Sequence, residues 1–138
     1  MTAVRNTPKT VEFAGIQGLT LIADEWGRGS EASTDKPSVL MLHGGGQNRF
    51  SWKNTGQVLA DHGFHVVALD SRGHGDSDRS PDADYDIETL SADVMHVLDA
   101  IGRGSAFVGA HWNPLVTSPP RYRAVLTEPN MTLVTPGL

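Results

Sequence analysis

The chain contains no cysteine among its 138 residues. This absence excludes a disulfide framework, a zinc site built from thiolates and a thiol nucleophile. Basic residues are also few, because 11 lysines and arginines stand against 16 aspartates and glutamates, and the formal net charge is −5. A negative surface opposes binding to nucleic acid or to an anionic membrane, so we expect neither partner.

Long hydrophobic runs are missing as well. No stretch approaches the ~18–20 apolar residues of a membrane-spanning helix. Residues 1–10 are polar and lack the apolar segment of a secretory signal, so we expect them to form a flexible tail. These absences predict a cytoplasmic protein, and a composition of 38% apolar and 20% charged residues is typical of one globular domain.

Apolar blocks of two kinds predict the strands. Runs around Val11 and Leu21, separated by Gly15 and Gly18, indicate an N-terminal β-hairpin. Short continuous apolar blocks at residues 38–42, 65–70 and 106–110 indicate strands buried on both faces.

Two segments between these blocks have helical periodicity. The first helix is expected over residues 52–62, with Ser51 as its cap, Val58 and Leu59 facing inward and Gly63 just past its end. The second is expected from an Asp86 cap to Gly102, with apolar residues at three- and four-residue steps. The hairpin followed by a βαβαβ pattern predicts an α/β fold with a parallel core, whose ligands collect at the carboxyl ends of the strands.

The first of these strand ends carries the sequence HGGG at residues 43–46. Acyl transfer builds negative charge on a carbonyl oxygen, and free backbone N–H groups aimed at that oxygen stabilise it. A glycine turn directly after a buried strand can present such N–H groups with no side chain in the way. The next strand ends in DSRGHGDS at residues 70–77, which matches the pattern D-x-R-G-x-G-x-S.

Together, the two motifs and the helix between them resemble the N-terminal half of the α/β-hydrolase family over residues 11–110, with small bacterial esterases and cofactor-free peroxidases as the nearest likeness. The resemblance implies a small-molecule acyl substrate, an ester-hydrolysing Ser-His-Asp triad and an oxyanion hole at Gly45 and Gly46. It implies no cofactor, and the six scattered histidines predict no metal site. The remaining pocket and scaffold candidates are His43, Gly44, Trp52, Asp70, Arg72, Gly73, Gly75 and Ser77.

The likeness to the family breaks after Ala110. The family places its nucleophile in G-x-S-x-G, but this chain has His111 in the serine position and Asn113 in that of the second glycine. Glu128 is the one carboxylate after that point, and no histidine follows. We therefore expect none of the three triad residues, and a divergent segment over residues 111–138 with one extra strand at 121–127.

Three interpretations remain open at this stage. The chain is a truncated or frameshifted hydrolase that is inactive as it stands, a non-catalytic binding or scaffold protein that retains the first half of the pocket, or a piece that a partner chain completes. Ending the parallel sheet early also predicts an exposed sheet edge through which copies can associate.

Overall fold

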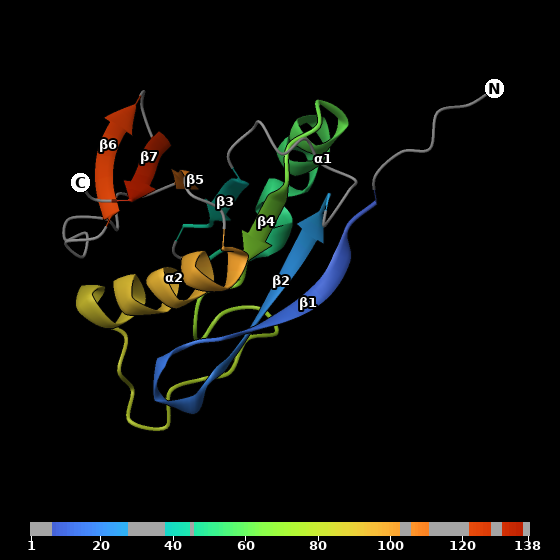
Figure 1. Ribbon diagram of the computed structural model, residues 1–138. Coiled ribbons are helices and arrows are strands. Elements are labelled where there is room, and N and C mark those ends of the chain that lie inside the picture. The colour runs from blue at the N-terminus through green and yellow to red at the C-terminus, as the bar shows by residue number, and fades with distance from the viewer. Residues whose placement is uncertain are drawn as a thin grey trace.

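The computed structural model describes residues 7–27, 38–44, 46–102, 106–110, 122–127 and 131–136. Within these ranges the chain forms a seven-stranded sheet in the order β1-β2-β4-β3-β5-β7-β6 (Figure 1). The strands are β1 (Lys9–Ala14), β2 (Thr20–Trp26), β3 (Ser38–Leu42), β4 (Val66–Leu69), β5 (Ala106–Ala110), β6 (Tyr122–Thr127) and β7 (Met131–Pro136). The helices are the 3₁₀ turns η1 (Ile16–Gly18) and η3 (Arg49–Trp52) and the α-helices α1 (Lys53–Asp61) and α2 (Ile87–Ile101).

The centre of the sheet is parallel and both of its sides are antiparallel. Strand β3 pairs in parallel with β4 and with β5, as the βαβαβ pattern predicts. The predicted hairpin β1–β2 adds to β4 in antiparallel orientation. On the other side, β7 pairs antiparallel to β5, and β6 pairs antiparallel to β7. The sequence did not indicate a strand at β7.

The two faces of the sheet carry separate hydrophobic cores. Leu40 and Leu42 of β3 pack with α2, whereas Val39 and Met41 belong to the cluster that contains Ala60 of α1. Residues of β4 alternate in the same way. Because successive side chains of a strand point to opposite faces, α1 and α2 cover opposite sides of the sheet.

The α2 prediction is confirmed at both ends. A carboxylate oxygen of Asp86 accepts the Thr89 N–H at 2.8 Å, which satisfies one of the free donors of the first turn. Gly102 ends the helix in the left-handed conformation, with φ of 73°. No helix in the described part of the chain is long and apolar enough to cross a membrane.

The prediction for α1 is wrong in two details. Asn48, not Ser51, acts as a cap, because its side-chain oxygen accepts the Phe50 N–H at the start of η3. Val58 is 54% exposed and faces away from the sheet. Leu59 does pack against the core on this side, partly buried, as expected, and the fully buried residues of α1 are the small Gly56 and Ala60. Gly63 does follow the helix with a positive φ of 87°, as expected.

Candidate functional site

The predicted glycine turn and the second motif lie at the same edge of the sheet. His43 directly follows β3, and Asp70 directly follows β4, its parallel neighbour. The residues after each strand therefore meet at the carboxyl edge, where open α/β sheets bind ligands.

Hydrogen bonds close the turn after β3. The Gln47 N–H donates to the Gly44 carbonyl at 3.1 Å, and the Gly44 N–H donates to the Gln47 side-chain oxygen at 3.0 Å. Gly46 has a φ of 74°, which a residue with a Cβ adopts only with strain. Since the Gly44 N–H is already engaged, it is not a candidate donor to a ligand. Gly45, a predicted oxyanion donor, lies outside the described residues.

His43 links this turn to the loop after β4. Its side chain is buried, with Nδ1 at 2.8 Å from the Gly44 carbonyl oxygen. Its Nε2 accepts the Ser71 N–H at 3.1 Å. The His74 ring lies beside it, with 4.9 Å between the ring centroids.

Asp70 makes a second link between the two loops. Its carboxylate is fully buried and accepts the Arg49 backbone N–H at 2.6 Å, the Arg49 guanidinium, and the Asp76 N–H at 3.0 Å. Gly75 passes so close that a Cβ there would lie 2.2 Å from an Asp70 oxygen. The motif therefore needs glycine at position 75 for space as well as for its φ of 50°.

Arg49 is a central residue of the site that sequence reasoning missed. The side chain is 6% exposed and contacts three carboxylates, those of Asp24 at 3.0 Å, Asp76 at 2.9 Å, and Asp70. Burial lowers the pKa of the guanidinium, but the hydrogen bonds that it donates to Asp76, Asp24 and Asp70 outweigh this effect and raise the pKa above its ordinary value. Arg49 is therefore a permanent positive charge that holds three aspartates together. No local pattern marked it, because its partners lie 21 to 27 residues away in sequence.

Ser77 attaches the second motif to the outer hairpin. Its hydroxyl donates to the Asp70 carbonyl at 2.6 Å and accepts the Ile22 N–H at 2.8 Å. The Asp78 carboxylate accepts the Thr20 N–H at 2.8 Å. Ile22 and Thr20 both belong to β2, so this end of the motif is scaffold.

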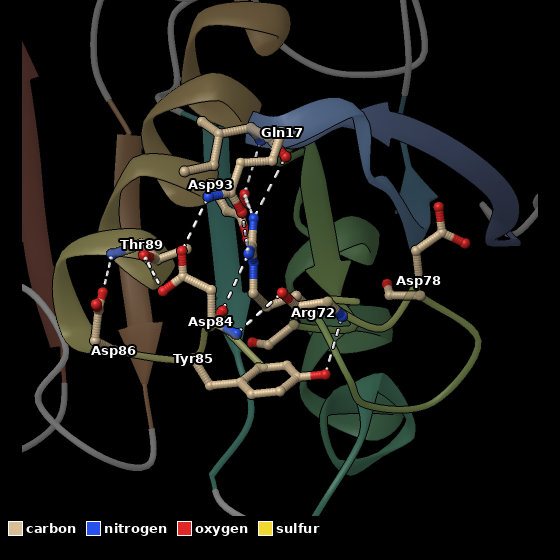
Figure 2. Close-up of polar contacts among 12 residues, drawn as sticks. Gln17, Arg72, Asp78, Asp84, Tyr85, Asp86, Thr89 and Asp93 are labelled. Atoms are coloured by element: carbon tan, nitrogen blue, oxygen red, sulfur yellow. Dashed lines mark hydrogen bonds and ion pairs between the residues drawn. The ribbon is translucent and has the colours of Figure 1, made fainter. Parts of the chain in front are cut away.

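Arg72, in the loop after β4, binds helix α2 (Figure 2). The side chain is fully buried and meets both Asp93 carboxylate oxygens, through Nε at 2.6 Å and Nη2 at 3.0 Å. Its Nη1 donates to Gln17 and to the Asp84 carbonyl, which brings the β1–β2 turn into the same contact set. The hydrogen bond to Asp93 raises the pKa of Arg72, so the guanidinium keeps its positive charge.

Two further predicted site residues, Gly73 and Trp52, have packing roles. At Gly73 an added Cβ would lie 2.6 Å from the Tyr85 ring, whose hydroxyl accepts the Ser80 N–H. Trp52, the expected pocket residue, is 9% exposed and belongs to the core cluster on the α1 side of the sheet.

His111 lies outside the described residues. Within the described ranges, no group of three metal-ligating side chains could hold an ion.

The opposite edge of the sheet holds a buried Ser-His-carboxylate chain that the sequence did not reveal. His65, just before β4, lies 2.8 Å from the Ser38 hydroxyl through Nδ1 and 2.8 Å from the Glu25 carboxylate through Nε2. Ser38 is 0% exposed and the other two side chains are 6% exposed. A nucleophile must reach its substrate, and these side chains are buried, so the arrangement is not an active site. It instead links β2, β3 and β4. The sequence signal was a polar residue at the start of β3, another just before β4 and a third near the carboxyl end of the antiparallel strand β2.

Comparison with known proteins agrees with this architecture. The family described as alpha/beta hydrolase fold matches residues 37–111. Epoxide hydrolase A of Mycobacterium tuberculosis is 42% identical over 113 residues, which cover 80% of this chain and 32% of that protein. The superfamily protein YfhM of Bacillus subtilis is 33% identical over 101 residues, or 72% of this chain and 34% of that protein. The chain thus spans about a third of the length of these relatives.

Solved structures lead to the same family. An epoxide hydrolase from Vigna radiata superposes with a TM-score of 0.63 at 31% identity, over 78% of this chain and 32% of that one. A thioesterase domain from the curacin biosynthetic pathway gives a TM-score of 0.62 at 26% identity, over 78% of this chain and 37% of that one. The similar structures therefore include epoxide hydrolases as well as an acyl-cleaving enzyme of the kind that the sequence resembles. The chain belongs to the α/β-hydrolase fold family.

Proposed function

We propose that this chain supplies the oxyanion side of an α/β-hydrolase site. The observation that carries the proposal is the glycine turn at the carboxyl end of β3, held by His43 and Gln47. The Gly44 N–H is engaged, so the donors we assign to a developing oxyanion are the N–H groups of Gly45 and Gly46.

Two substrate classes suit such a turn. Ester hydrolysis places negative charge on a carbonyl oxygen, and opening of an epoxide ring places it on the ring oxygen. Several relatives are named epoxide hydrolases, and the sequence resembles the ester-cleaving members of the family. We therefore propose an ester or an epoxide as the substrate of the complete site.

We further propose that the 138-residue chain is catalytically silent by itself. The residue in the nucleophile position is His111 and not serine, and Asn113 replaces the second glycine of the sharp elbow turn. The abrupt loss of family pattern after Ala110 supports a changed reading frame or an internal deletion at that point. Sequencing the coding DNA through codon 110 and translating all three frames tests this, because a frame with the elbow motif is expected.

The test of activity uses the purified chain with p-nitrophenyl acetate and with styrene oxide, at matched protein concentrations. We expect no turnover above buffer for either compound. Turnover that a serine-directed inhibitor abolishes would overturn the proposal of a silent chain, and turnover of styrene oxide alone would assign the epoxide class.

A non-catalytic binding protein is the second candidate function. It is favoured by a glycine turn that His43 and Gln47 hold, and by a sequence with His111 in the position of the family's serine nucleophile. NMR titration with benzamide, whose carbonyl oxygen accepts N–H donors, tests whether the turn binds such a ligand. Saturable shifts of the Gly45 and Gly46 amides, absent with toluene, support a working oxyanion turn and this binding function. Protein that is insoluble, or shifts that match those with toluene, would count against it.

Self-association is a separate proposal about partners. Strand β7 covers the edge of β5, where the sequence predicted an open edge, so the outermost strands of the described sheet are β1 and β6. An unpaired strand edge is a template for a second copy. We expect the sedimentation coefficient of the chain to rise with concentration, and a constant monomer value would refute this.

A further inference from the structure

His43 carries the furthest inference, because its two ring nitrogens contact groups of opposite character. A backbone carbonyl only accepts, so the Nδ1 that lies 2.8 Å from the Gly44 oxygen carries the hydrogen. A backbone N–H only donates, so the Nε2 that receives the Ser71 N–H presents a lone pair. Both contacts exist together only in the neutral imidazole with its hydrogen on Nδ1.

The Gly44 carbonyl joins this ring to the glycine turn. That oxygen accepts the His43 ring N–H and also the Gln47 N–H at 3.1 Å. Both of its lone pairs are therefore used, and the Gly44 carbonyl has a defined direction. On the other side of the ring, Ser71 is the first residue after Asp70. One buried side chain thus connects the turn after β3 with the loop after β4.

The surroundings of the ring favour this single orientation. His43 is 1% exposed, and the His74 ring lies beside it at an interplanar angle of 55°. His74 is held in turn, because its Nδ1 lies 3.0 Å from the Arg72 carbonyl oxygen. A flip of the His43 ring would present a bare carbon where each contact now stands.

We propose that His43, as the neutral Nδ1–H tautomer, is a positioning residue that sets the direction of the glycine turn against the β4 loop. The proposal rests on the proposed oxyanion role of the turn for its functional meaning. It adds that the tautomer, and not the bulk of the side chain, does the positioning.

Two substitutions separate the two contacts. Asparagine places an amide nitrogen near the position of Nδ1, so His43→Asn keeps a donor to Gly44 and loses the acceptor for Ser71. Glutamine extends to the position of Nε2, so His43→Gln keeps an acceptor for Ser71 and loses the donor to Gly44. A side chain that only fills space would make both variants alike.

The experiment measures amide hydrogen exchange at Ser71 and Gln47, with ¹⁵N NMR of the histidine rings in the unaltered chain. We expect one protonated and one unprotonated nitrogen in His43, with the proton on Nδ1. Exchange at Ser71 should rise by up to about tenfold in His43→Asn, the equivalent of one hydrogen bond, and remain near its original value in His43→Gln. Exchange at Gln47 should show the reverse order.

Several results would overturn this inference. A proton on Nε2, or two equivalent protonated nitrogens, contradicts it in the unaltered chain even if neither variant folds. Equal exchange at both amides in both variants shows that His43 is only a packing residue. These readouts need no substrate, so their failure is distinct from a failure of the benzamide titration, which tests the oxyanion turn itself.

Discussion

Replacing Gly75 by alanine tests whether Asp70 is the rigid centre of the candidate site. The new Cβ would stand 2.2 Å from one Asp70 carboxylate oxygen and 2.4 Å from Cγ. Asp70 cannot retreat, because its side chain is fully buried and is held by Arg49 and by the Asp76 N–H. The backbone cannot relax easily either, because position 75 has a φ of 50°.

Two effects add in this variant. A residue with a Cβ in the left-handed region is destabilised by about 1–2 kcal/mol. Overpacking of a rigid buried site contributes about 1–3 kcal/mol more. We therefore expect Gly75→Ala to lower the free energy of unfolding by about 2–5 kcal/mol, a large fraction of the stability of a small domain.

Gly18→Ala is the matched control. Gly18 also has a positive φ, of 72°, but an added Cβ there meets nothing within 4 Å. Only the backbone effect of about 1–2 kcal/mol applies to it. Urea unfolding followed by tryptophan fluorescence measures both variants, with the slope of the transition as a check on the two-state treatment. Equal destabilisation of the two variants would refute the claim that Asp70 is immovable.

Three further predictions concern the elements around the site. Gly56→Ala should lower stability by up to about 2 kcal/mol, although alanine is the better helix former, because its Cβ would lie 2.7 Å from the Trp26 ring. Ser38→Ala should lower stability by about 1–3 kcal/mol in urea unfolding, because a buried nitrogen of His65 loses its partner. Asp86→Ala should destabilise α2 at neutral pH but less in acid, measured by circular dichroism across a pH series.

The sign of the last effect follows from the pKa of the cap. The hydrogen bonds from Thr89 lower the pKa of Asp86 in the folded chain. A lowered folded-state pKa means that the charged cap stabilises the fold above the unfolded pKa of 3.8 and loses this contribution as the pH falls through the folded value. A difference between Asp86→Ala and the original chain that stays constant from neutral pH into acid would contradict this account.

Substitutions at exposed positions serve as controls for the other two predictions, Thr55→Ala for Gly56→Ala and Ser51→Ala for Ser38→Ala. Thr55→Ala tests the effect of alanine in α1 without a contact to Trp26, since Thr55 is exposed, and it should leave stability nearly unchanged. Ser51→Ala removes a hydroxyl from an exposed position and should also have little effect. If Gly56→Ala leaves stability unchanged or raises it, the close approach of Trp26 to α1 is not rigid.

Much of the fold follows from local sequence. Continuous apolar blocks predicted β3, β4 and β5, and the period of α2 together with Asp86 and Gly102 predicted that helix and its ends. The two motifs predicted the family, which the comparisons confirm. These signals are local because burial on two faces, helix capping and left-handed turns each constrain residues within a few positions of one another.

The face of α1 could not be read in the same way. Val58 is apolar yet exposed, and Gly56 is buried because the Trp26 ring, from a distant strand, occupies the space beside it. Hydrophobicity alone favours a large side chain on the inner face, but the space beside the Trp26 ring admits only a small residue at position 56.

The sequence by itself determined where strands, helices and the two glycine-bearing motifs lie, because each depends on neighbouring residues. Only the tertiary structure decided that Arg49 gathers Asp24, Asp70 and Asp76, and that His65 joins Ser38 to a carboxylate at the far edge. These contacts join different strands and loops, so no local pattern marks them. They form because a polar group that folding removes from water must find its partner inside the protein, wherever the sheet places it.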